Sequence, residues 1–190
     1  MTFKRLLVFS GLTAGLGACA SAPDPMLYTL APSSPAEGSV DDGVLIGLSE
    51  IGLPSYARNQ QITTARGPYR VTEDDDNRWA RPPAEAISAR MASVLEAEIG
   101  GDVLMRPYPA GVRPDIRLTV SFDRLLRASG GGAELAGQYI ITGIDDEVQV
   151  DRFDIRVPAQ AGDYEGYMQA LADGLDRLCD QIAEMVEELD

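Results

Sequence analysis

Apolar residues recur at helical spacing along the whole carboxy-terminal end of the chain, and no other segment limits the possible folds so strongly. Successive members are four or three residues apart, and acidic residues occupy the opposite face. The series is Tyr164, Met168, Leu171, Leu175, Leu178, Ile182, Met185 and Leu189. Such a helix can pair in a coiled coil or cover the apolar face of a sheet. Because Gly166 and Gly174 weaken a free-standing helix, we favour the helix that covers a sheet.

The segments upstream supply the strands of that sheet. The clearest is 116–123, where apolar and polar residues alternate as in a half-buried antiparallel strand. Weaker patterns predict further strands at 44–48, 61–65, 69–71, 103–105, 135–142 and 148–157. In the last strand the apolar phase slips near Asp151 and Arg152, which predicts a bulge. The acidic stretch 73–77 is predicted to be a solvated turn.

A second helix is predicted in the middle of the chain. Pro82 and Pro83 suit its first positions, where a missing N–H costs nothing, and Gly100 suits its end. Apolar residues between them repeat at helical spacing. We therefore predict an α+β fold in a single domain, with a mostly antiparallel mixed sheet covered by two helices, one mid-chain and one long and carboxy-terminal. This domain occupies residues 44–190.

The amino terminus has the form of a bacterial lipoprotein signal. A short basic region and an apolar run precede the sequence LGAC, which ends at Cys19. The apolar run is too short to span a bilayer, which takes about 20 residues. We predict that residues 1–18 are removed and that Cys19 carries the acyl chains; an ordinary secretory signal is the alternative. Ala20 favours sorting to the outer membrane, on its periplasmic face.

Residues 19–43 are predicted to form a tether, because they are rich in alanine, proline, serine, glycine and aspartate. One apolar island at 26–30 interrupts it and can form a short strand. We favour a strand that docks on the domain over one that stays loose. The domain would then sit close to the membrane surface.

Composition excludes several functions. The formal net charge of −14 repels nucleic acid and anionic membrane surfaces. The chain has no histidine, and its only lysine, Lys4, lies in the predicted signal, so Ser-His-Asp chemistry, Schiff bases and common zinc sites are absent. We predict no enzyme, no metal and no cofactor; a carboxylate pair acting on a glycan is a distant alternative. Cys179 lies in the apolar helical pattern and is predicted to be a buried thiol.

Two segments resemble a known family. They read LPSYARNQQITTAR at 53–66 and NRWARPP at 77–83, and the sequence Tyr-Thr-Leu at 28–30 precedes them. Together they are similar to the ABC-type transport auxiliary lipoproteins, the PqiC/YmbA-like family, whose pattern has Arg-x-Gln before a strand and Arg-Trp-Ala-x-Pro before a helix. Two departures are Arg81, where the family often has an acid, and an extra residue between Arg58 and Ile62.

The resemblance implies an accessory role in transport. Such lipoproteins work with an ABC transporter and a periplasmic MCE-domain protein that moves phospholipid or other hydrophobic molecules between the inner and outer membranes. The lipoprotein would dock the conduit at the outer membrane, in some cases as a ring-like homo-oligomer. The partner-binding candidates are Arg58, Gln60, Arg66, Arg78 and Trp79, since arginine and tryptophan are favoured at interface hot spots. These residues also have interpretations that involve no partner: Trp79 can belong to the core, the arginines can pair with acids, and Gln60 can simply face water. An envelope-assembly or cell-wall-binding lipoprotein is the alternative function.

Overall fold

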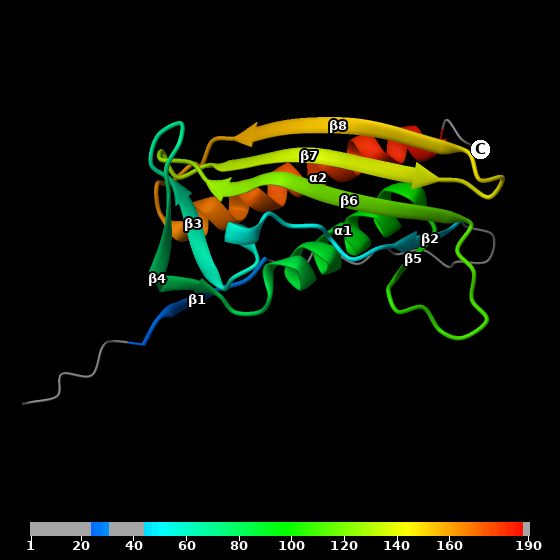
Figure 1. Ribbon diagram of the computed structural model, residues 1–190, viewed down its shortest axis with the longest axis horizontal. Helices are drawn as coiled ribbons and strands as arrows, with labels where there is room; N and C mark the ends of the chain where they lie inside the picture. Colours follow the sequence, from blue (N-terminus) through cyan, green and yellow to red (C-terminus); the bar gives the residue numbers. More distant parts are fainter. Residues whose placement is uncertain (1–23, 31–43, 188–190) are drawn as a thin grey trace, which may run out of the picture.

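The strand β6 (Ile116–Arg127) is the centre of an eight-stranded mixed sheet (Figure 1). The computed structural model describes residues 24–30 and 44–187, so Cys19, the predicted signal and much of the predicted tether lie outside the described residues. On one side of β6 the chain continues antiparallel into β7 (Ala133–Thr142) and then β8 (Val148–Val157). These two long ladders make most of the sheet antiparallel, as predicted.

The other side of β6 carries two separate groups of strands. Near its start β6 pairs in parallel with β2 (Leu45–Leu48), which pairs in parallel with β5 (Asp102–Met105). At its end β6 meets β3 (Gln61–Ala65), which is followed outward by β4 and β1. The bounds of these last two strands are Val71–Trp79 and Met26–Tyr28. Figure 1 shows β1 and the β3–β4 hairpin at one end of the molecule and β2 and β5 at the other.

Two helices, α1 (Pro83–Ile99) and α2 (Tyr164–Glu187), complete the domain. Pro82 stands at the N-cap of α1, and Gly100 ends the helix with a φ of 70°, a conformation that glycine adopts at little cost. The apolar seam of α2 is buried against β7, β8 and α1, so this helix covers the sheet instead of forming a coiled coil. The predicted fold class is confirmed.

An ion pair joins the two helices at their contact. The guanidinium of Arg90 donates to both carboxylate oxygens of Asp176, at 2.9 and 2.6 Å, and the Arg90 side chain is only 12% exposed. These hydrogen bonds raise the pKa of Arg90. Beside them Cys179 is fully buried and its thiol points to the carbonyl oxygen of Met91. The prediction of a buried thiol is confirmed.

The bulge predicted in the last strand is wrong. The β7–β8 register runs unbroken through Asp151 and Arg152, and the bulge lies in β6, between Phe122 and Arg124. The apolar phase slips because Val148 and Val150, 59% and 58% exposed, lie on the opposite face of β8 from its buried residues. Alternation alone does not show which phase faces the core.

The strand predicted at 69–71 begins at Val71 and continues to Trp79, so the solvated turn predicted at 73–77 is wrong: this acidic stretch lies within β4. In β4 the register jumps from Arg78, opposite Gln61, to Asp74, opposite Ile62, so the three residues between them leave the ladder. The carboxylate of Asp74 accepts the N–H groups of Asp76 and Asn77, at 2.9 and 3.0 Å. An aspartate can make such a local turn without ending the strand.

Candidate functional site

Trp79 is the last residue of β4 and belongs to the core. Trp79 is 4% exposed, and its backbone N–H donates to the backbone carbonyl oxygen of Gln60 at 2.7 Å. This hydrogen bond fixes the start of β3 against the end of β4, where the chain turns into α1. Trp79 therefore occupies the core position that was its alternative prediction, and it can affect a partner only by positioning its neighbours.

Three other candidates lie together at that end of the hairpin. Arg58 follows the short 3-10 helix η1 (Ser55–Ala57), and its Nε donates to the carbonyl oxygen of Leu53 at 2.9 Å. Gln60 is exposed two residues later, and Arg78 lies opposite Gln61 in the β3–β4 register. The Nε of Arg78 donates to the backbone oxygen of Asp75 at 2.8 Å, with the carboxylate of Asp75 3.8 Å away.

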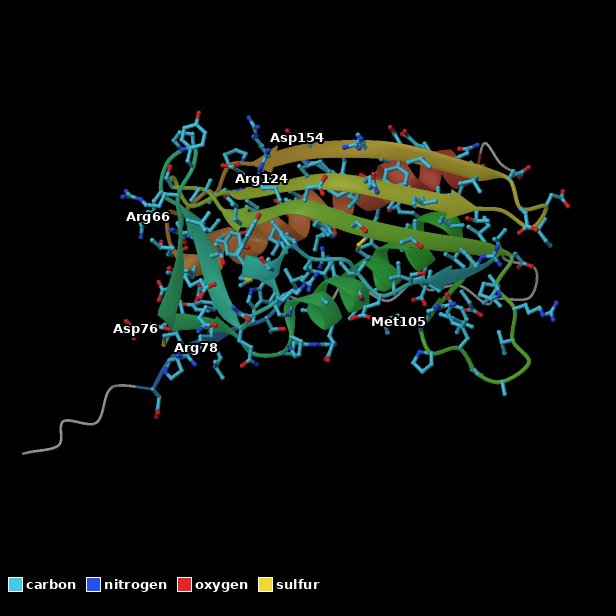
Figure 2. The ribbon with its side chains drawn as sticks, in the orientation of Figure 1. Arg66, Asp76, Arg78, Met105, Arg124 and Asp154 are labelled. Carbon is cyan, nitrogen blue, oxygen red and sulfur yellow. The ribbon has the colours of Figure 1, made fainter. Side chains whose placement is uncertain are left out.

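Arg66 lies apart from this group. It is the first residue of the hairpin loop, and its Nε donates to the hydroxyl of Thr72 at 3.2 Å. Figure 2 shows Arg66 and Arg78 at opposite ends of the β3–β4 hairpin. The structure thus places Gln60 next to Arg78 across the hairpin, with Arg58 two residues before Gln60 in the chain, and keeps Arg66 apart.

The strand β1 borders the same end of the hairpin. It pairs in parallel with the last residues of β4, with Leu27 opposite Arg78 and Tyr28 opposite Trp79. The hydroxyl of Tyr28 donates to Asn77 at 3.1 Å, and the Tyr28 ring contacts that of Tyr164, the first residue of α2. The segment that follows the predicted anchor is therefore attached to the body beside Arg78.

A hydrogen bond between Tyr164 and Asp74 supports this attachment. The Tyr164 hydroxyl donates to the carboxylate of Asp74, and the guanidinium of Arg127 lies 4.7 Å from the Tyr164 ring centre. Partial burial opposes ionisation of Asp74, but hydrogen bonds from Tyr164 and from the N–H groups of Asp76 and Asn77 outweigh it and lower its pKa. Burial, and after it the hydrogen bond to the Asp74 carboxylate, raise the pKa of Tyr164.

Two adjoining clefts lie beside the first turns of α1. One, of about 1020 Å³, separates α1 from the end of β2 and the loop after β5; the other, of about 520 Å³, is lined by Arg58. Both are lined by Glu50 and Ala84, and we call them together the α1 groove. Arg81 and Arg106 line its larger part. Of its charged residues only Arg58 was a candidate from the sequence; an Arg-Pro-Tyr-Pro motif at 106–109 was the signal that could have indicated the rest.

No metal site is present among the described residues: no group of three or more histidine, cysteine, aspartate or glutamate side chains there is placed to hold an ion. Among residues 24–30 and 44–187, neither helix is long and apolar enough to cross a membrane.

Comparison with solved structures defines the class of protein by its fold. A crystal structure of an uncharacterised protein superposes with a TM-score of 0.73 at 15% identity, covering 86% of this chain and 99% of the other. A Xanthomonas campestris protein of the DUF330 family superposes with a TM-score of 0.65 at 13% identity, covering 87% and 100%. No curated protein is significantly similar in sequence. The α+β fold of this chain is thus shared by both of these solved proteins.

The family model for the ABC-type transport auxiliary lipoprotein component matches residues 28–183. The chain belongs to this family, as the residues at 53–66 and 77–83 predicted. Its members are auxiliary lipoproteins of ABC-type transport systems.

Proposed function

We propose that this protein is a lipid-anchored periplasmic component of an ABC/MCE-type system that moves phospholipid between the two membranes, and that it docks the transport conduit at the outer membrane. The family match, which spans residues 28–183, carries the proposal. The sequence LGAC at 16–19 supports it, because acyl chains on Cys19 would hold the domain at a membrane. The role is non-catalytic and needs no cofactor, in keeping with a chain that has no histidine.

The position of β1 explains how anchoring and docking can be coupled. From Cys19 to Met26 the chain has seven steps, which reach about 25 Å at full stretch. Since Leu27 lies opposite Arg78, a partner bound at Arg58, Gln60 and Arg78 is held close to the membrane. The pairing of β1 with β4 and the contact of Tyr28 with Tyr164 would connect the anchor to the folded core.

The experiment is photo-crosslinking in cells, with a photoreactive amino acid at Arg58 or Arg78 and a control at Arg177, an exposed residue on α2. We expect both candidate positions to capture an MCE-domain protein and the control position to capture none. Deletion of the protein should also disturb the lipid asymmetry of the outer membrane. Failure to capture such a partner, together with wild-type asymmetry in the deletion strain, would refute the proposal and favour an envelope-assembly role.

A further inference from the structure

The α1 groove concentrates positive charge on an acidic protein. Arg58, Arg81 and Arg106 line it, against only Glu50 and Glu85, although the whole chain has a formal charge of −14. All three arginines are exposed. An anionic group in this groove would be attracted, although the protein as a whole is acidic.

Two of these guanidinium groups are held in place without a carboxylate. Within the described residues, the Arg81 guanidinium has a carboxylate 3.8 Å away, that of Glu85. By contrast, Arg58 donates its Nε to the backbone oxygen of Leu53, and the Arg106 guanidinium lies 5.4 Å from the ring centre of Tyr108. A contrasting cluster on β6, β7 and β8 pairs its arginines with acids, as in Arg124 with Asp154 at 3.5 Å. The groove arginines therefore retain donors for an outside carboxylate.

The groove also offers apolar surface. Ala84 and Val112 lie in its wall, together with Met105 at the end of β5 (Figure 2). The Met105 side chain is 48% exposed. Pro107 and Tyr108 border the same end. A single small anion would leave this surface in water, whereas a longer ligand that alternates acidic and apolar groups would cover it.

The open shape of the groove favours a peptide ligand over a lipid. Acyl chains need an enclosed apolar cavity, but here they would lie in an open cleft with charged walls. An extended peptide can lie in such a cleft and project alternate side chains to either wall. We propose that the α1 groove binds an extended acidic segment of a partner protein, with its carboxylates on Arg58, Arg81 and Arg106 and an apolar side chain on Met105. That this partner belongs to the transport system rests on the proposed function; the chemistry of the segment rests on the groove.

Binding can be tested with a short fluorescein-labelled peptide that alternates glutamate with leucine and proline, and with a second peptide that has lysine for each glutamate. We expect the full-length lipidated protein in detergent to bind the first peptide, and the second at least about tenfold more weakly. Losing one charge-assisted contact of about 1.4 kcal/mol corresponds to a tenfold loss of affinity, so Arg106→Glu should weaken binding by about tenfold or more. Arg113→Glu, on the same loop but outside the groove, is the matched control and should bind like wild type. Because Arg58 also bonds the backbone, Arg58→Gln serves as a second variant only if its thermal unfolding is unchanged.

Absence of binding, equal binding of the two peptides, or equal loss in Arg106→Glu and Arg113→Glu would overturn the proposal. Displacement of the glutamate peptide by phosphatidylglycerol vesicles would overturn it in favour of a lipid ligand. In cells, a photoreactive residue at Met105 should crosslink to an acidic stretch of the same partner captured at Arg58, as read by sequencing the crosslinked peptide. If Arg58 and Arg78 capture that partner while Met105 does not, the groove proposal fails and the docking function stands. If no position captures a transport protein but the peptide binds, the docking function fails alone.

Discussion

The ring of Tyr28 lies 5.6 Å from the ring of Tyr164, and this contact joins the strand that follows the predicted anchor to the start of the longest helix. Two hydrogen bonds reinforce it, one from Tyr28 to Asn77 and one from Tyr164 to Asp74. The strand β1 has only three residues and two of them, Met26 and Leu27, are mostly exposed. Its attachment therefore depends on Tyr28 more than on burial of the strand.

We expect Tyr28→Ala to detach β1 without unfolding the domain. The variant loses an aromatic pair worth about 0.5–1.5 kcal/mol and a hydrogen bond. The backbone N–H of Ala80 donates to the backbone carbonyl oxygen of residue 28, so its hydrogen exchange should speed up when β1 detaches. Exchange in β6 and β7 should stay unchanged. Tyr69→Ala is the control, since Tyr69 is fully exposed and its loss should change neither. Equal exchange rates at Ala80 in wild type and Tyr28→Ala would contradict the interpretation.

The Arg90–Asp176 pair should stabilise the helix contact measurably. Asp176→Ala leaves a guanidinium that is 12% exposed without its two carboxylate hydrogen bonds, so we expect a loss of about 1.5–3 kcal/mol in the free energy of unfolding in urea. Asp180→Ala removes an exposed acid from the same helix and should change stability by no more than about 0.5 kcal/mol. Indistinguishable variants would show that the pair contributes nothing.

The sequence predicts the helices and most strands because their signals are local. The helical spacing in α2, the prolines before α1 and the alternation in β6 each follow from neighbouring residues. The parallel pairing of β1 with β4 has no such signal, since the two strands are separated by the whole of β2 and β3. The continuation of β4 through the acidic stretch was missed, because a run of acids has the same pattern in a loop and in an interrupted strand.

The candidate site was predicted in part for the same reason. Gln60 immediately precedes β3 and Trp79 ends β4, so the two residues meet at the open end of one hairpin, and the length of that hairpin separates Arg66 from Arg78. The α1 groove escaped prediction because its walls come from segments that adjoin only after folding: the end of β2, the start of α1 and the loop after β5.

The Asp74 carboxylate should make the stability depend on pH at the acid end. Its pKa is lower in the folded protein than its ordinary value of 3.8, so it stabilises the fold above that value, and the contribution is lost as pH falls through the folded pKa. Thermal unfolding midpoints of wild type and Asp74→Asn, measured from pH 7 downward, should therefore differ most near neutral pH and converge below about pH 4. A difference between the two unfolding midpoints that stays constant with pH would show that the charge of Asp74 does not cause the effect.

The thiol of Cys179 should be protected in the native state. It is fully buried, and burial, followed by the nearby Asp176 and Asp180, raises its pKa. Since the thiolate is the reactive form, a disulfide reagent should label the native protein far more slowly than the urea-unfolded protein. Measuring the Cys19→Ala variant leaves Cys179 as the sole cysteine of the chain. Equal labelling rates in the two states would show that α2 opens readily.

The anchor and the docking surface should be separable. We expect Cys19→Ala, exported through a cleavable secretory signal, to give a folded domain that leaves the membrane fraction, because the acyl chains that would retain it are missing. Arg58 and Arg78 are held by hydrogen bonds to Leu53 and Asp75 within the folded domain, so crosslinking at Arg58 should still capture the partner. If the proposed function holds, lipid asymmetry should nevertheless fail, as we expect for the deletion strain, because the domain would no longer hold the conduit at the membrane. Wild-type asymmetry with the released domain would show that binding alone suffices, and that the short connection from Cys19 to β1 has no part in transport.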